Sequence, residues 1–194
     1  MIGAEHITQN TESKDNRLLV AIRQFIFGKS DAFEIIYNST APALMAICRR
    51  YASNTDEAKD ILQESYIKIY KHLHKFDLKT PFENWAKRIA INTAIDHYRK
   101  NIKKTLSALH DIDVMEEEED LFVSSDILNY DIEKVLLAIQ ELPDGYRIIL
   151  NLFVMENKSH REISELLNIS ESTSRSQLSK ARKTLKLKFE NGIQ

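Results

Sequence analysis

Cysteine, proline and glycine are scarce in this chain of 194 residues, which contains one cysteine, three prolines and four glycines. The single cysteine, Cys48, cannot form an internal disulfide, which favours a reducing compartment and a packing role in the apolar run ALMAIC. Few glycines and prolines, beside many Leu, Ile, Lys, Glu and Ala, disfavour sheets with frequent tight turns. We therefore expect an all-α protein.

Long apolar runs and catalytic signatures are also missing. No run approaches the roughly 18 residues of a membrane span, and the first 15 residues contain no apolar core of signal-peptide length. We expect a cytoplasmic protein without direct membrane insertion. His72 and His74 are spaced too closely for a metal pair on one helix, and no glycine-rich phosphate loop or nucleophile elbow occurs. No enzyme activity, metal, cofactor or small-molecule substrate is expected.

The net charge of −2 conceals an uneven distribution. Residues 1–100 hold 15 basic and 12 acidic side chains, residues 101–130 hold 2 and 8, and residues 131–194 hold 10 and 9. The acidic middle contains DIDVMEEEED and no sustained helical stripe, which predicts a linker at 101–130 between small domains at 15–100 and 131–190. Two roles stay open for this linker: a solvated tether, or a mimic of nucleic-acid phosphates in a basic channel of a partner.

The first domain contains DEAKDILQESYIKIYKHL, whose apolar positions follow i, i+3, i+4 spacing. This pattern predicts a helix that buries Ala58, Ile61, Leu62, Ser65, Ile69 and Leu73. The opposite face presents Asp60, Gln63, Glu64, Lys68 and Lys71. Taken alone, this pattern indicates only a solvent-exposed face. Two earlier helices are predicted, one ending at Gly28 and one that Ser30 could cap and Pro42 could kink or divide.

After Pro81, the stretch FENWAKRIAINTAIDHYRK predicts a helix that buries Trp85, Ile89, Ala90 and Ile95 or their neighbours. The other face of this helix carries polar side chains that are available to solvent or to nucleic acid: Lys87, Arg88, Asn92, Asp96, His97, Arg99 and Lys100. Phe82 and Trp85 fit the apolar stripe, so packing is favoured over stacking on bases, although both roles stay open.

The last domain predicts a helix-turn-helix. Ser159 and Glu162 form an S-x-x-E capping box ahead of a short apolar-periodic helix. Asn168 tolerates the left-handed backbone of a turn, and Ser170 can cap the final helix. That helix is expected to turn Thr173, Leu178, Ala181 and Leu185 inward, leaving Arg175, Ser176, Gln177, Ser179, Lys180 and Lys183 outside.

Residues 172–185 carry four basic side chains and no acidic one. On an ordinary solvated helix, basic and acidic side chains would be expected to alternate, so this bias indicates an anionic partner outside the chain. A basic helix of this kind fits the major groove of DNA, where Arg and Lys contact guanine edges or phosphates. We expect DNA binding.

These stretches also carry a family resemblance. LPDGYRIILNLFVMENKSHREISELLNISESTSRSQLSKARKTL resembles the fourth conserved region of bacterial sigma factors. DEAKDILQESYIKIYKHLHKF and FENWAKRIAINTAIDHYRK resemble the second region, in the right order and at the right separation. Two regions joined by a linker, over roughly residues 15–190, are similar to the extracytoplasmic-function (ECF) group.

The resemblance implies an alternative sigma factor whose partners are core RNA polymerase, promoter DNA and an anti-sigma factor. Polymerase contacts are implied for Asp60, Gln63 and Glu64. The −10 element would be opened and read by the loop near residues 76–85 and by Lys87, Arg88, Asn92, Asp96, Arg99 and Lys100, with Asn92 matching a position associated with that element. The −35 element would be read through Ser159, Arg175, Ser176, Ser179, Lys180 and Lys183. The linker would run toward the polymerase active-site channel and RNA exit path.

Two positions depart from the family pattern. Ser174 stands where the family usually has an apolar residue, and Asn168 where glycine is frequent. An alternative is a helix-turn-helix regulator that acts without polymerase, which would explain only the C-terminal third. A helical interaction protein without a DNA role is a further alternative.

Overall fold

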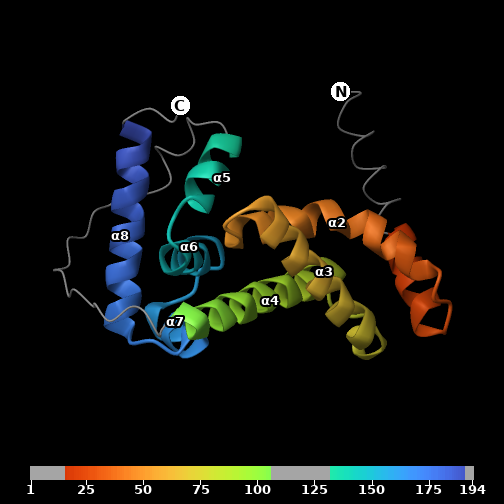
Figure 1. The fold of residues 1–194 in the computed structure, drawn as a ribbon. Helices are drawn as coiled ribbons and strands as arrows, with labels where there is room; N and C mark the ends of the chain where they lie inside the picture. The colour runs from red at the N-terminus through yellow and green to blue at the C-terminus, as the bar shows by residue number, and fades with distance from the viewer. Residues whose placement is uncertain (1–15, 106–131, 191–194) are drawn as a thin grey trace, which may run out of the picture.

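The computed structural model describes residues 16–105 and 132–190, which form helices joined by loops and contain no strand. Figure 1 shows two groups of helices, α2 to α4 in one group and α5 to α8 in the other. The all-α expectation with two helical domains is confirmed. The acidic segment predicted as a linker lies, from residue 106 onward, outside the described residues.

The N-terminal group begins with a helix over residues 16–26 that ends in a turn at Gly28, whose φ of 93° suits glycine. It continues with α2 (Ala32–Tyr51), α3 (Thr55–His72), the short 3₁₀ helix η1 (Leu73–Lys75) and α4 (Phe82–Thr105). The expected cap by Ser30 is wrong, because the N-cap residue is Asp31, which is itself helical and makes no side-chain cap bond. Pro42 does not divide α2, which runs through it while packing against α3 and α4.

The core of this group follows the predicted stripe of α3. All six residues expected to be buried are buried, including Ser65, whose hydroxyl donates to the Ile61 carbonyl at 2.6 Å. The helix starts at Asn54, whose side-chain oxygen accepts from the Glu57 N–H at 2.9 Å. In the core the stripe packs against α2 and α4, and this packing fixes which face of α3 stays exposed.

At the start of α4 three aromatic rings form a cluster. Phe82 is almost fully buried, and its ring lies edge-on to that of Phe76 with centroids 5.5 Å apart. Trp85 is half-buried beside both, with centroids 5.2 Å from Phe76 and 5.6 Å from Phe82. Packing accounts for Phe82, while Trp85 keeps part of its ring at the surface.

The C-terminal group consists of α5 (Ile132–Gln140), α6 (Asp144–Leu150), the π-helical turn η3 (Asn151–Met155), α7 (His160–Leu167) and α8 (Glu171–Glu190). Its core contains Ile139, Ile149, Ile163, Leu178 and Leu185, among others. Ile132, although apolar, is 83% exposed. It is the first residue of the helix, six positions before the first buried residue, Ala138, and no part of the described chain covers it.

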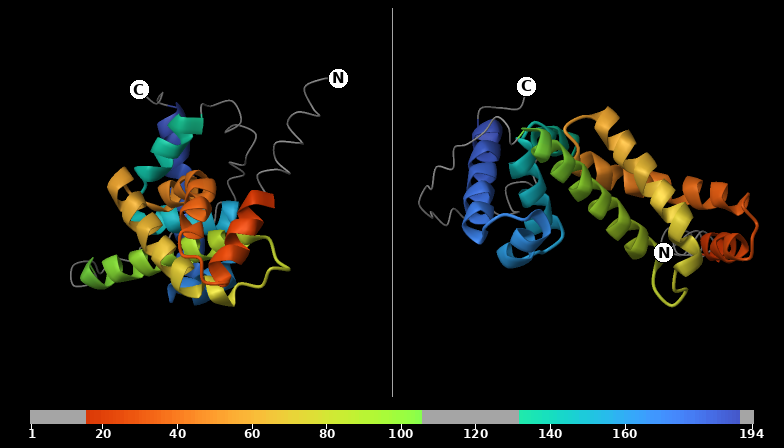
Figure 2. Two further views of the ribbon diagram at one scale, coloured as in Figure 1. Left: turned by 90° about the vertical axis from the view of Figure 1, so that its right-hand side faces the viewer. Right: turned by 60° about the horizontal axis from the view of Figure 1, so that its bottom comes forward.

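The two groups touch each other. Helix α2 contacts α5 and α6, and α4 contacts α6 and α7. Figure 1 shows the C-terminal end of α4 beside α7, and the right-hand view of Figure 2 shows the two groups adjoining. No helix within residues 16–105 and 132–190 is both long and apolar enough to cross a membrane.

Candidate nucleic-acid interface

The capping box predicted at Ser159 is present at the start of α7. The Ser159 hydroxyl accepts from the Glu162 N–H at 3.2 Å, and the Glu162 carboxylate accepts from the Ser159 N–H at 2.9 Å. Lys158 donates to the other oxygen of Glu162 at 2.6 Å. This bond and those from Ser159 lower the pKa of Glu162 to about 2, so the carboxylate stays charged at neutral pH. The Ser159 hydroxyl is thus engaged within the chain.

A tight turn sets the angle between α7 and α8. Asn168 has φ 55° and ψ 49°, the left-handed conformation that was predicted, and its N–H donates to the Ser164 carbonyl. Ser170 then caps α8, because its hydroxyl accepts from the Thr173 N–H at 3.0 Å. The expected helix-turn-helix is therefore built from the caps that the sequence predicted.

The outer face of α8 carries five of the six residues predicted for the −35 element. Arg175, Ser179 and Lys183 are exposed, and Ser176 and Lys180 are half-buried. At 3.6 residues per turn, these five span about 140° of the helix surface. Arg175 pairs with Glu171 at 3.1 Å, but both side chains are about half exposed, so this pair adds little stability and can be exchanged for another anion.

Beneath this face lies a polar pair that the sequence did not predict. Ser174, rather than the expected Thr173, is fully buried, and its hydroxyl lies 2.9 Å from Nδ1 of His160. The His160 ring stacks on Phe153 with centroids 4.7 Å apart. Burial, followed by the nearby Arg175 and Arg182, lowers the pKa of His160. The sequence signal for this pair was Ser174 itself, which stands where an apolar residue is usual. A buried hydroxyl needs a hydrogen-bond partner, so a serine at that position indicates one nearby.

The six residues predicted on α4 do not share one surface. Asp96 pairs with Lys68 of α3 at 3.0 Å, and Lys100 lies 3.6 Å from Glu64 of α3. The other four line a crevice between α4 and the C-terminal group: Lys87, Arg88, Asn92 and Arg99. The structure therefore divides the predicted −10 set between an α3-facing pair and a crevice-facing group.

This crevice has a volume of about 600 Å³ and is walled on the other side by Leu152, Glu156, Glu162 and Leu166, among others. Lys87 forms an ion pair with Glu156 at 2.8 Å, and Arg99 donates a hydrogen bond to the Leu166 carbonyl. Glu156 is only 11% exposed, so its pairing with Lys87 is less screened than a surface pair. Sequence spacing gave no signal for Glu156.

The three residues predicted for polymerase contact adjoin on α3. Asp60 and Gln63 are exposed, and Gln63 borders a groove lined by Tyr37, Ile67 and Tyr70, among others. Glu64 is half-buried, and its carboxylate lies 3.0 Å from Nε2 of His97 on α4. Asp60 and Gln63 are therefore open to a partner, whereas Glu64 already takes part in packing α3 against α4.

Family models match both helical groups of the chain. Residues 36–103 match sigma-70 region 2, and residues 132–185 match sigma-70 region 4. The first match ends within α4 and the second covers α5, α6, α7 and most of α8.

Individual relatives agree with these matches. The chain is 32% identical over 180 residues to the ECF RNA polymerase sigma factor SigW of Bacillus subtilis, covering 85% of this chain and 92% of SigW. It is 34% identical over 140 residues to SigM of the same organism, covering 70% of this chain and 82% of SigM. A solved structure of the sigma factor RpoE with the anti-sigma factor NepR from Bartonella quintana covers 82% of this chain and 98% of its own, with TM-score 0.47 and 19% identity. By its two regions and by its identity to SigW over most of both chains, this chain belongs to the ECF group of sigma-70 family RNA polymerase sigma factors.

Proposed function

We propose that this protein is an alternative sigma factor that binds core RNA polymerase and directs promoter recognition, DNA opening and transcription initiation. The observation that carries the proposal is the presence of both sigma regions, in order, each on its own helical unit. A helix-turn-helix regulator acting without polymerase accounts for α5 to α8 only, because it leaves the match of residues 36–103 to region 2 without a role.

Helix α8 is the proposed reader of the −35 element. Its exposed face combines one arginine, two lysines and two serines without an acidic residue between Ser172 and Leu185. Arginine and lysine suit guanine edges and phosphates, and serine contacts either edges or backbone. Ser159 contributes through the start of α7, where its hydroxyl is held by the capping box.

Helix α4 is the proposed reader of the −10 element, with Asn92 at its centre. The Asn92 amide both donates and accepts hydrogen bonds, as recognition of an extruded base requires. Asn92 is exposed and lines the crevice, so no packing role competes with this proposal. Asn92→Ala should reduce promoter opening more than initial docking, measured by permanganate footprinting of unpaired thymines. Normal bubble formation would show that Asn92 takes no part in opening the promoter.

Polymerase binding is proposed for Asp60 and Gln63 on the open face of α3, with Glu64 at its edge. The acidic segment at 101–130 is proposed to run along a basic channel of the polymerase, and its excess of acidic residues supports this role. An anti-sigma factor stays a predicted partner, and isolating the chain from its native cell under mild salt would test it.

Run-off transcription with purified core polymerase on a library of genomic fragments tests the whole proposal. Transcripts that appear only when this protein is added would support it and would identify the promoter. Binding to promoter fragments should also require polymerase and weaken steeply with salt. Specific, tight binding without polymerase would instead favour the regulator that acts alone.

A further inference from the structure

The His160 and Ser174 pair joins the two helices that are proposed to meet the −35 DNA. His160 is the first residue of α7 and directly follows Ser159, whereas Ser174 directly precedes Arg175 on α8. Ser159 and Arg175 are both exposed, and both are among the residues predicted to read the −35 element. The pair therefore lies one position away from a proposed DNA contact on each helix.

Packing fixes the orientation of the His160 ring. The ring stacks on Phe153 of η3 with centroids 4.7 Å apart, and the guanidinium carbon of Arg182 lies 5.6 Å from the centre of the Phe153 ring. In this orientation Nδ1 of His160 lies 2.9 Å from the buried Ser174 hydroxyl. Within residues 16–105 and 132–190, Nε2 has no hydrogen-bond partner and is not enclosed, so it can exchange a proton with solvent.

The Ser174 hydroxyl suits both protonation states of the ring. A neutral imidazole has one donor nitrogen and one acceptor nitrogen, whereas an imidazolium has two donors. The hydroxyl can donate to Nδ1 of the neutral ring and accept from Nδ1 of the charged ring. The contact that positions α8 against α7 therefore survives protonation of His160, whereas an apolar side chain at position 174 would offer neither bond.

The charged groups that face His160 from the described chain lie on α8. Burial, followed by Arg175 and Arg182, lowers the pKa of His160, and Glu171 opposes this shift. In the free protein the ring is therefore mostly neutral at pH 7. Its charge state depends on which ions lie beside the first three turns of α8.

The other elements around His160 add little to this balance. η3 contributes the uncharged ring of Phe153, and α4 meets α7 near its other end, at the Leu166 carbonyl. The charged neighbours on α7 are already paired, Glu162 with Lys158 and Arg161 with Glu165. The field at His160 is therefore set mainly by α8, the helix that is proposed to bind DNA.

DNA on α8 would change that field. Arg175 is exposed and pairs with Glu171 at 3.1 Å, and phosphates that approach this side of α8 add several negative charges to it. Anions beside Arg175 offset its repulsion of a proton on His160, because an opposite charge nearby favours the charged form of the ring. A protonated His160 would in turn attract the phosphates.

We propose that His160 takes up a proton when α8 binds duplex DNA, and that this uptake strengthens −35 binding while Ser174 holds α8 in place. His160 is then a positioning residue that also makes the affinity of α8 for DNA depend on pH. The proposal rests on the −35 role proposed for α8, but proton uptake can be measured with any duplex that α8 binds.

The sign of the pH dependence distinguishes this role from a purely structural one. Between the pKa of His160 in the free chain and its higher pKa in the complex, the complex binds more protons, so DNA affinity increases as pH falls. The stability of the free chain changes in the opposite direction, because folding lowers the pKa of His160. A histidine that only supported the fold would make affinity and stability decrease together.

Fluorescence anisotropy of a labelled random-sequence duplex with the free, full-length chain at low salt measures this dependence between pH 7.5 and pH 6. Wild-type affinity should increase relative to that of His160→Asn by about threefold, within the limit of about tenfold per pH unit that uptake of one proton allows. His72→Asn removes an exposed histidine at the end of α3 and should follow wild type. Lys183→Ala should weaken binding, which would place the duplex on α8.

Parallel pH profiles for wild type and a folded His160→Asn would overturn the proposal. Circular dichroism would reveal a variant that does not fold, and His160→Gln is the second non-titrating replacement. Isothermal titration calorimetry of wild type in two buffers with different ionisation enthalpies counts the protons taken up with the duplex. Binding by wild type without proton uptake would overturn the proposal whatever the variants do.

Holoenzyme should show the same difference between wild type and His160→Asn on a duplex that carries the −35 element identified by run-off transcription. A chain whose proton uptake depends on His160 but that supports no transcription would refute the proposed function and still support the proposal. A chain that supports transcription, with equal pH profiles in wild type and His160→Asn, would do the reverse.

Discussion

Ser174 is a polar residue at a position of α8 where an apolar side chain would be expected from packing alone. It is fully buried, and its hydroxyl has His160 as partner at 2.9 Å. A buried hydroxyl without a partner would cost about 1–3 kcal/mol, so the serine and the histidine depend on each other. The pair joins the start of α7 to the first turn of α8, and so it supports the angle of the helix-turn-helix.

The His160 and Ser174 pair should make stability depend on pH. Burial and two nearby arginines lower the pKa of His160 in the folded state below its ordinary value of 6.5. Below pH 6.5 the unfolded chain then binds the proton more readily than the folded chain. The contribution of His160 is therefore complete above pH 6.5 and is lost as pH falls through the folded-state pKa.

Urea unfolding at pH 7.5 and pH 5.5 would measure this effect against His160→Asn, which keeps a polar atom near Ser174 but does not titrate. The free energy of unfolding of the wild type should fall more between these pH values than that of the variant. Parallel losses in the two proteins would show that His160 does not carry the pH dependence.

Arg175 and Lys183 should differ in role because they lie at different distances from the N-terminal end of α8. Arg175 is near the end that we propose enters the major groove, and Lys183 is two turns further along. Arg175→Ala should relax preference at one −35 base pair by about 1–3 kcal/mol. Lys183→Ala should weaken all promoters alike and flatten the salt slope by about one unit.

Competition binding of holoenzyme to promoters varied singly across the −35 element would separate the two roles. Lys186→Ala, further along the same helix, serves as the matched control for loss of a charge. A uniform loss of affinity with Arg175→Ala would identify Arg175 as a phosphate contact.

At the scale of the element, the turn after α7 depends on one backbone conformation. Asn168 has φ 55°, which is costly for side chains other than glycine and asparagine. Asn168→Ala should lower the free energy of unfolding by about 1 kcal/mol, and Asn168→Gly should change it by about 0.5 kcal/mol or less. Urea denaturation followed by circular dichroism would measure both. Equal losses for the two variants would mean that the asparagine side chain, and not the backbone angle, determines the stability.

Helix α3 presents one face to the core and the opposite face to a proposed partner. Asp60 is exposed, so Asp60→Lys should leave the fold intact. It should weaken binding to core polymerase by about tenfold or more, because the new lysine either repels a basic group of the partner or loses the ion pair that Asp60 made. Glu34→Lys on α2 is the matched charge reversal. Pull-down titration with core polymerase would compare them, and equal affinities would favour a merely solvated face. Glu64 is a poorer probe because it pairs with His97.

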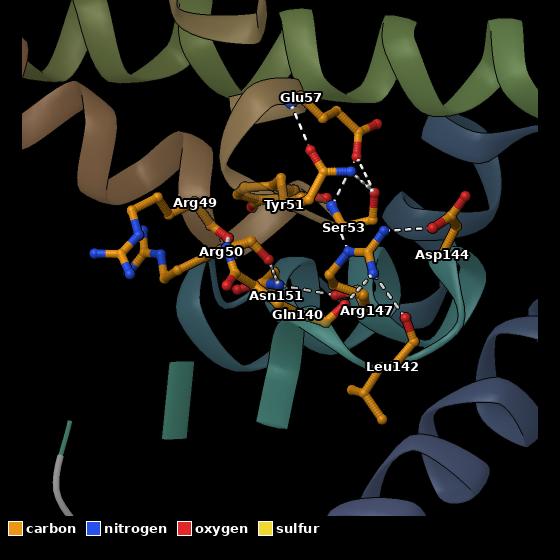
Figure 3. A network of polar contacts seen from close by, with 11 residues as sticks. Arg49, Arg50, Tyr51, Ser53, Glu57, Gln140, Leu142, Asp144, Arg147 and Asn151 are labelled. Atoms are coloured by element: carbon orange, nitrogen blue, oxygen red, sulfur yellow. Dashed lines mark hydrogen bonds and ion pairs between the residues drawn. The ribbon is translucent and has the colours of Figure 1, made fainter. Parts of the chain in front are cut away.

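At the scale of the whole molecule, hydrogen bonds at the end of α2 should couple the unfolding of the two domains. Side chains of the C-terminal domain cap this helix end, because they donate to the carbonyls of its last three residues (Figure 3): Gln140 to Arg49, Asn151 to Arg50 and Arg147 to Tyr51. Trp85, the sole tryptophan, lies in the N-terminal domain and reports on it by fluorescence. Arg147→Met leaves several buried carbonyls without their donor, so it should destabilise the C-terminal domain by about 3 kcal/mol or more. It should also shift the Trp85 transition to lower urea concentration.

Leu185→Ala is the control for this coupling. Leu185 is buried in the C-terminal core, and Leu→Ala in a core costs about 2–5 kcal/mol. At matched loss of C-terminal stability, Arg147→Met should move the Trp85 transition further than Leu185→Ala does. Equal shifts would show that no special coupling passes through the cap of α2.

The sequence by itself determined the local structure of this protein. Helical periodicity predicted the buried stripe of α3, and short-range cap chemistry predicted Ser159, Asn168 and Ser170, because these signals depend only on residues within a few positions of one another. The ordered family motifs also predicted the sigma-factor identity.

Only the tertiary structure decided how the faces of these helices are used. Periodicity placed Lys87, Asn92 and Arg99 on the polar surface of α4, but it could not show that Glu156 and the Leu166 carbonyl occupy part of that surface. Likewise, no local pattern pairs Arg147 with the Tyr51 carbonyl, 96 positions away. Such contacts form between residues distant in sequence, and they exist because a helix end with unused carbonyls meets a domain with donors to supply.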